Sequence, residues 1–241
     1  MRALLISDVH GNIDVLHALE TQWGARFREF ERIICLGDLV DYGPSPGDVI
    51  EWVRAHATHV VRGNHDHAVA TGEPCKSATA FLEASVLTRL RLQPTLTEGQ
   101  IDYLNSLPLT DTLTDPGLNG GAPLHLVHAC PRSPLHEYMP PQRTDAEWSA
   151  ALDDVNGATV LIGHTHVAFA RLVGAGLVIN PGSLGMPKDG NAHGSYAVLD
   201  GPSVQFCRIA YDPEPMLGRL QALKLPPHVF AQLAQTFRTG T

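Results

Sequence analysis

The sequence contains few cysteines and no long apolar run, and these shortages exclude two classes of protein. Its 241 residues include four cysteines, none of them in a C-x-x-C pair, so neither a zinc knuckle nor a disulfide framework is indicated. No stretch approaches the ~18–20 apolar residues that a transmembrane helix needs. The apolar run at the start is too short for a signal peptide and is interrupted by Asp8. We therefore expect a cytoplasmic protein that has no membrane partner.

Positive charge is also scarce in this chain. It has 17 Lys and Arg residues against 25 Asp and Glu residues, which gives a formal net charge of -8. Long nucleic acids are usually bound by a basic face, so we expect no such partner. The 44% of hydrophobic residues can form a substantial core, and we expect residues 1–241 to fold as a single domain. The oligomeric state is left open.

Apolar runs alternate with helical spacing in the first quarter of the chain. The segments RALLIS, RIICLG and THVVRG are continuous apolar runs, typical of strands that are buried on both faces. The segments between them have the apolar spacing of helices, which indicates a mostly parallel sheet with helices packed against it. Residues from about 77 to 107 also have helical spacing, and we expect a small helical cap at about 70–107, inserted over a site.

The second half of the chain predicts another sheet. The segments AFARLV, GLVIN, SYAVLD and VQFCRIAY alternate apolar and polar residues and are separated by turns, which favours a second, antiparallel sheet. Two facing sheets with helices outside them, an α/β architecture, is the simplest arrangement.

Polar side chains that can bind metals follow five of the strand-like runs. The ends of strands in open α/β sheets are where ligands bind, so these side chains are expected to share one site. Carboxylate, imidazole and amide ligands without a thiolate suit Mn, Fe, Zn, Co or Ni. They are too numerous for one tetrahedral ion, which favours two divalent ions. The residues at these strand ends are Asp8, His10, Asp38, Asp41, Asn64, His65, Asp66, His128, His164 and His166.

Each motif by itself also fits a turn or a helix cap, and only the ordered set argues for a metal centre. The set DVHGN, GDLVDYG, GNHD, VHA and GHTH resembles the calcineurin-like metallophosphoesterase superfamily. The short start and the segment INPGSLG are similar to its small bacterial and archaeal phosphoesterase branch. The resemblance covers most of residues 3–210. It implies a four-layer αββα sandwich with two facing mixed sheets.

The resemblance also implies which residues hold the metals. One ion would be bound by Asp8, His10, Asp38 and His166. The other would be bound by Asp38, Asn64, His128 and His164, with Asp38 bridging the two. Manganese is favoured, and iron, nickel, zinc or cobalt are alternatives.

Four further residues are expected to act on the substrate. By the same resemblance, His65 would protonate or stabilise the leaving oxygen, and Asp41 would orient His65. Asn12, at the start of a helix, could present an amide to the phosphate, and Arg62 could contribute positive charge. Tyr42 stands where protein phosphatases of the superfamily have an arginine, which argues against a phosphoprotein substrate.

Taken together, these features predict a phosphomonoesterase or phosphodiesterase. A hydroxide bridging two metal ions would attack the phosphorus of a small-molecule or nucleotide ester. Two alternatives remain. One is a binding or scaffold protein on the same fold, like the retromer subunit that resembles this family. The other is a nuclease, against which the acidic composition counts.

Overall fold

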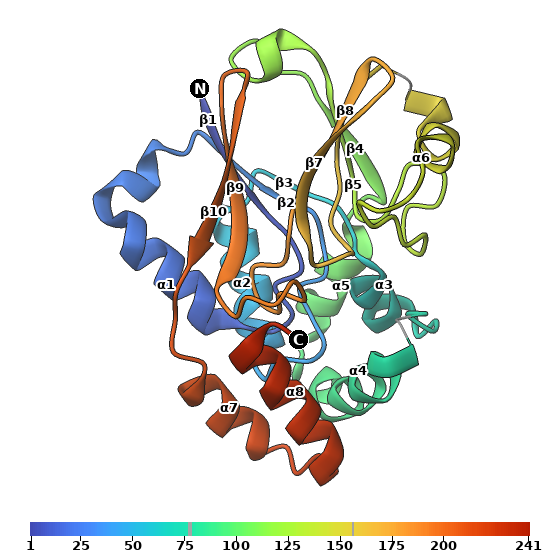
Figure 1. Cartoon of the computed structure of the whole chain (residues 1–241). Helices are drawn as coiled ribbons and strands as arrows, with labels where there is room; N and C mark the ends of the chain where they lie inside the picture. The colour runs from blue at the N-terminus through green and yellow to red at the C-terminus, as the bar shows by residue number, and fades with distance from the viewer. Residues whose placement is uncertain (77–78, 156) are drawn as a thin grey trace.

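The computed structural model of the protein describes residues 1–76, 79–155 and 157–241. Within these residues, ten strands form two five-stranded sheets that face each other, with helices outside them. Figure 1 shows α1 (Ile13–Trp23) and α6 (Asp145–Ala151) on opposite sides of the pair of sheets. The expected four-layer αββα arrangement is confirmed.

The first sheet has the strand order β10-β9-β1-β2-β3. The central pair is parallel, with Leu4 opposite Ile33, and the two later strands add to it antiparallel. The strands are β1 (Arg2–Ile6), β2 (Arg32–Cys35), β3 (His59–Val60), β9 (Gly194–Asp200) and β10 (Ser203–Ile209).

The second sheet has the order β4-β5-β6-β8-β7, with both outer pairs antiparallel and both inner pairs parallel. It is therefore mixed. The expectation of an antiparallel second sheet that contains β9 and β10 is wrong, because this hairpin pairs with β1 instead. The strands are β4 (Thr110–Leu113), β5 (Leu124–Val127), β6 (Thr159–Leu161), β7 (Ala168–Val173) and β8 (Gly176–Pro181).

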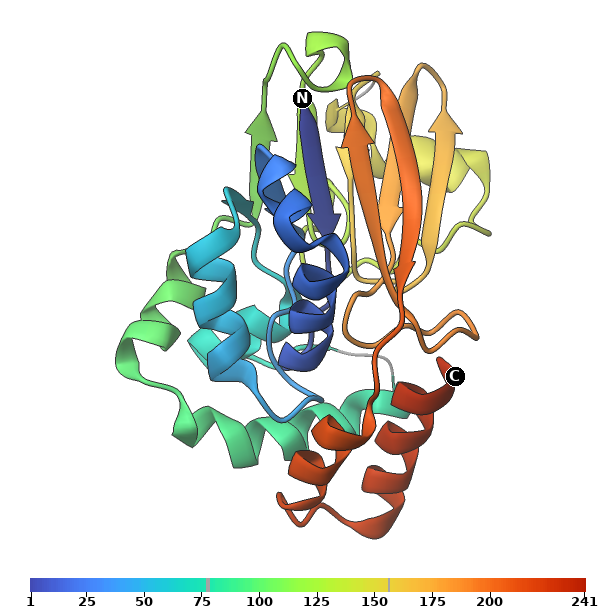
Figure 2. The same cartoon turned by 90° about the vertical axis from the view of Figure 1, so that its left-hand side faces the viewer.

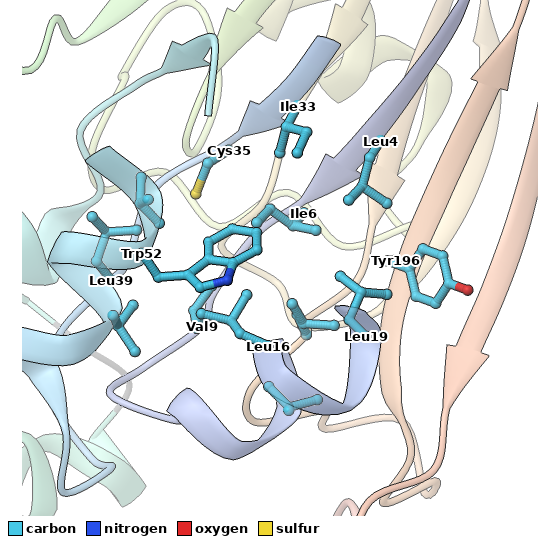
Figure 3. Close-up of a cluster of buried hydrophobic side chains, with 14 of the residues drawn as sticks. Leu4, Ile6, Val9, Leu16, Leu19, Ile33, Cys35, Leu39, Trp52 and Tyr196 are labelled. Carbon is cyan, nitrogen blue, oxygen red and sulfur yellow. The ribbon is translucent and has the colours of Figure 1, made fainter. Parts of the chain in front are cut away.

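Alternation along β1 divides the core between two faces of the first sheet. Leu4 and Ile6 point to the outer face, where Figure 3 shows them with Leu16, Leu19 and Trp52. Ala3 and Leu5 point to the inner face and pack against side chains of the second sheet. Successive strand residues face opposite ways, so burial of both faces explains the continuous apolar run. Each fully buried Leu or Ile contributes roughly 1.5–3 kcal/mol.

Helices α4, α7 and α8 gather beyond one edge of the sheets, as Figures 1 and 2 show, whereas α2 packs beside α1 on the outer face of the first sheet. Side chains of α4, α7 and α8 form one apolar cluster with Tyr42 and Met186. The segment expected to form a cap contains α4 and α5, and its residues 77 and 78 lie outside the described residues. The remaining helices are α2 (Pro46–His56), α3 (Asn64–Thr71), α4 (Thr79–Leu92), α5 (Glu98–Ser106), α7 (Glu214–Gln221) and α8 (Pro227–Thr239).

Short 3-10 turns complete the connections, at Gly24–Glu29, Gln93–Thr95, Asn119–Gly121 and Asp153–Val155. Among the described residues, no helix combines the length and apolarity required to cross a bilayer.

Candidate metal centre

The loops that follow the carboxyl ends of the strands carry the site, and their backbone is unusual. Five of the seven expected ligands have φ between +48° and +66°, a region that residues other than glycine rarely adopt. Such conformations cost about 1–3 kcal/mol each and persist where the surrounding structure enforces them, often at functional sites. The five residues are Asp8, His10, Asp38, His164 and His166.

Hydrogen bonds between the loops enforce these conformations. The carboxylate of Asp66, at the start of α3, accepts hydrogen bonds from the backbone N–H groups of Asp38 and Leu39, each at 2.8 Å. The N–H of His65 donates to Oδ1 of Asp38 at 2.9 Å. The loop after β2 is therefore tied to the first turn of α3, and Asp66 serves this loop rather than a ligand group.

The first ligand group consists of Asp8, His10 and His166, which are buried and lie close enough to hold a metal ion. Nδ1 of His10 faces the carbonyl of Val40 at 2.8 Å, and Nδ1 of His166 faces that of Met186 at 2.5 Å. Carbonyls only accept hydrogen bonds, so both rings carry their proton on Nδ1. Their Nε2 lone pairs therefore face each other across 3.2 Å.

One carboxylate oxygen of Asp8 points at these two rings and shows whether the group could bind a metal ion. Oδ1 of Asp8 lies 3.3 Å from Nε2 of His166, is buried, and lacks a hydrogen-bond partner among the described residues. Three lone-pair atoms that converge without a donor repel one another, and a buried polar atom without a partner costs free energy. A cation removes both costs, so these residues fit a divalent metal.

The second ligand group consists of Asp38, His128 and His164. Nδ1 of His128 donates to the carbonyl of Leu36 at 2.7 Å, and its Nε2 lies 3.1 Å from both Oδ2 of Asp38 and Oδ1 of Asn64. The amide nitrogen of Asn64 donates to the carbonyl of Cys75 at 2.7 Å, which turns its oxygen toward His128. The amide oxygen of Asn64 is thus oriented as it would be if it bound a metal ion.

Asp38 lies between the two groups. Its Oδ2 is 3.1 Å from Nε2 of His128 in the second group and 3.8 Å from Nε2 of His10 in the first. The structure therefore brings all seven residues expected to bind metal into two adjacent clusters that share one carboxylate.

Burial and mutual charge set the protonation of these groups in the metal-free protein. Burial, with a contribution from Asp38, raises the pKa of Asp8 to about 6. Burial lowers the pKa of His10 and of His164 to about 3, so both imidazoles are neutral and ready to bind metal. His128 differs, because its pairing with Asp38 outweighs burial and raises its pKa to about 9. A proton thus occupies the second group until a metal ion displaces it.

His65 lies beside the ligands and is held by Asp41, as expected. Its Nδ1 is 2.6 Å from Oδ2 of Asp41, and both side chains are buried. Burial opposes ionisation of both groups. It is outweighed by their hydrogen bond and charges, which lower the pKa of Asp41 and raise that of His65. Nε2 of His65 lies 3.4 Å from the hydroxyl of Tyr42.

Two residues of α4 hold Asp41, and the sequence analysis did not identify them. The guanidinium of Arg89 donates to both carboxylate oxygens of Asp41, and the hydroxyl of Ser85 donates to Oδ2 at 2.9 Å. Thr88 of the same helix accepts a hydrogen bond from the backbone N–H of Tyr42. A Ser and an Arg four positions apart on one helical face were the available signal, but their target lies 44 and 48 residues earlier in the chain.

The structure places Asn12 and Arg62 away from the expected substrate contacts. Asn12 caps α1, and its amide nitrogen donates to the carbonyl of Gly185 and the hydroxyl of Tyr211, each at 2.9 Å. Arg62 donates to the carbonyls of Asn105 and Leu107 at the end of α5. Both side chains are already used within the protein and neither lines the pocket, so the structure does not support a substrate contact for either.

A pocket of about 340 Å³ opens over the two ligand groups. Asp38, Asn64, His164 and His166 form part of its lining. Beyond these ligands, its walls carry aromatic and basic side chains from distant loops, including Tyr42, His65, Lys76, Phe81, Tyr138 and Lys188.

The sequence matches the model of the calcineurin-like phosphoesterase superfamily domain over residues 1–202. The chain belongs to this superfamily. This membership confirms the resemblance drawn from the motifs, and the family is one of phosphoesterases that use divalent metal ions.

Relatives of known sequence or structure extend over most of this metallophosphoesterase. It is 28% identical over 240 residues to the uncharacterized protein MJ0912 of Methanocaldococcus jannaschii, covering 92% of this chain and 93% of that protein. A metallophosphoesterase crystal structure from Sphaerobacter thermophilus superposes with a TM-score of 0.75 and 28% identity, covering 97% and 98% of the two chains. A symmetrical bis(5'-nucleosyl)-tetraphosphatase of Yersinia enterocolitica is 37% identical over 109 residues, only 40% of this chain and 37% of that enzyme.

Proposed function

We propose that this metallophosphoesterase hydrolyses a small-molecule or nucleotide phosphate ester at a centre of two divalent metal ions. The observation that carries the proposal is the convergence of Asp8, His10 and His166, whose facing lone pairs require a cation. The partial similarity to a nucleotide-cleaving enzyme supports a nucleotide as one class of substrate.

The ligands would divide between the ions as the two clusters suggest. Asp8, His10, His166 and Asp38 would hold one ion, and Asp38, Asn64, His128 and His164 would hold the other. Manganese is our first choice, because oxygen and imidazole ligands without sulfur suit it. When bound, the ions would supply Lewis-acid polarisation of the phosphate and lower the pKa of the water that attacks it.

The protein's own groups would position the substrate and move one proton. Carbonyls keep the Nδ1 protons of His10, His128 and His166 in place, so Nε2 of each remains a ligand. Asp41 likewise keeps Nδ1 of His65 protonated, which leaves Nε2 to deliver a proton to the departing oxygen. Because α4 holds Asp41, we further propose that residues 1–241 work as one domain with 70–107 as its cap.

The first experiment measures metal content and hydrolysis together. Purified protein is loaded with Mn, Fe(II), Ni, Zn, Co or Mg and assayed on monoesters, diesters, dinucleotides and short oligonucleotides. Asp38→Asn should lose both metal and activity, because Oδ2 of Asp38 serves both clusters. His65→Ala should keep its metal and lose ~10²–10⁴ in rate, the usual contribution of a general acid.

Each alternative predicts a different result. Loaded protein that hydrolyses none of these esters would point to the scaffold function, and cleavage confined to oligonucleotides would point to the nuclease. Loss of metal from His65→Ala would show that His65 is a ligand and that the assignment of a general acid is wrong.

A further inference from the structure

Lys188, like Lys76, is a basic residue of the pocket that no part of the proposed reaction uses, and Lys188 is the one held against aromatic rings of the pocket wall. It lies on the loop between β8 and β9, and its Nζ is 4.3 Å from the ring centroid of Phe81 and 5.5 Å from that of Tyr42. Cation–π contacts of this kind hold an ammonium over an aromatic face without neutralising it. In the described part of the chain, its side chain forms no hydrogen bond or ion pair.

The loop that carries Lys188 contacts the first ligand group, because the backbone N–H of Lys188 donates to the carbonyl of His166 at 3.4 Å. The half-buried ammonium lines the same pocket as Asp38, His164 and His166, and among the described residues no carboxylate forms an ion pair with it.

Tyr138 contributes a second unexplained feature. Its side chain is 47% exposed although it lines the pocket, its ring lies 5.8 Å from that of His164, and its hydroxyl donates to the carbonyl of Thr165 at 3.3 Å. The hydroxyl bond anchors the side chain, about half of which remains exposed to solvent. Exposed aromatic side chains are platforms on which nucleobases stack.

We propose that Lys188 binds the phosphate of the substrate and that Tyr138 stacks on its ring, so the substrate class is a small nucleoside or aryl phosphate. This inference rests on the proposed hydrolysis of phosphate esters. The pocket volume of about 340 Å³ is near the lower end of small-ligand sites, roughly 300–1,000 Å³. It suits a mononucleotide-sized molecule and is too small for a duplex or a folded polypeptide.

Two variants separate the phosphate contact from the ring contact. Lys188→Met should raise KM by about 10-fold or more for both AMP and glycerol 2-phosphate, because a charge-assisted hydrogen bond to phosphate is lost. Tyr138→Leu should raise KM by about 5-fold or more for AMP alone, because only AMP has a ring to stack. Lys224→Met, which removes an exposed lysine between α7 and α8, is the matched control and should match the wild type.

Binding of inorganic phosphate to the Mn-loaded protein, measured by calorimetry, tests Lys188 independently of catalysis. Lys188→Met should weaken it about 10-fold, Lys188→Arg should restore most of it, and Tyr138→Leu should leave it unchanged. Wild-type phosphate affinity in metal-loaded Lys188→Met would overturn the phosphate contact. An equal effect of Tyr138→Leu on both esters would overturn the ring contact. If the wild type cleaves no ester, the proposed function is wrong. The affinity for inorganic phosphate would still show whether Lys188 contacts phosphate.

Discussion

Removal of Arg89 tests whether the cap takes part in proton transfer. Arg89→Met deletes the guanidinium that donates to both oxygens of Asp41, while the hydroxyl of Ser85 and the ring of His65 remain as partners. Among the described residues, Arg89 hydrogen-bonds to Asp41 and Ser85 and forms no ion pair with a proposed ligand. We therefore expect its loss to disturb the orientation of His65 without releasing metal.

The size of the effect follows from burial. The side chain of Asp41 is 1% exposed and that of Arg89 is 12% exposed, so the pair is largely out of water. Removing one partner of a buried ion pair costs about 3–5 kcal/mol, and because Ser85 and His65 remain we expect about 3 kcal/mol of lost stability. General acids contribute ~10²–10⁴ in rate, and because the hydrogen bond between Asp41 and His65 survives, we expect a loss of about 10- to 100-fold.

The assay compares two leaving groups. Phenyl phosphate needs a proton on its departing oxygen far more than p-nitrophenyl phosphate does, so Arg89→Met should slow the first by about 10- to 100-fold and the second by less than about 3-fold. Arg91→Met, an exposed position of the same helix, should change neither rate. Equal slowing on both substrates, or a loss of bound metal, would refute this account of Arg89.

Four other predictions concern the metal centre. Mn in excess should raise the melting temperature, since ligand at ~100 times its Kd adds about 2.7 kcal/mol, and an unchanged melting curve would contradict the site. Metal affinity should rise between about pH 6 and 9, because Asp8 and His128 must lose protons whose pKa values are raised to about 6 and about 9. The His128–Asp38 pair stabilises the metal-free protein fully below the unfolded histidine pKa near 6.5, and this stabilisation is lost as the pH rises through the folded pKa of about 9. The increase in melting temperature on adding Mn should therefore become larger as the pH rises. Gly63→Ala should release metal, because its Cβ would lie 2.0 Å from Oδ1 of Asp38, whereas Gly99→Ala, with open space around it in α5, should retain metal.

The polar residues at the strand ends could be identified from the sequence, because the pattern that marks them is local. An apolar run followed at once by Asp, His or Asn indicates where a strand stops and what it presents there, and parallel strands deliver such groups to one edge of a sheet. The two-sheet α/β fold and the ten polar residues at the strand ends could therefore be predicted, and the family resemblance selected seven of them as ligands. Asn12 and Arg62 were less predictable, because a polar side chain near a site has many possible partners and here found them within the protein.

Only the tertiary structure determined which distant segments meet. The β9–β10 hairpin has the same alternating pattern whichever sheet it joins, and packing of both faces of β9 beside β1 places it in the first sheet. Likewise, nothing local to α4 indicates that Arg89 and Ser85 reach back to Asp41, or that Lys188 lies over Phe81. Periodicity reports which face of an element is buried, whereas contacts between elements depend on how their surfaces fit in three dimensions. The candidate ligands could thus be identified from the sequence. The groups that orient them, and those that surround the pocket, could be identified only from the structure.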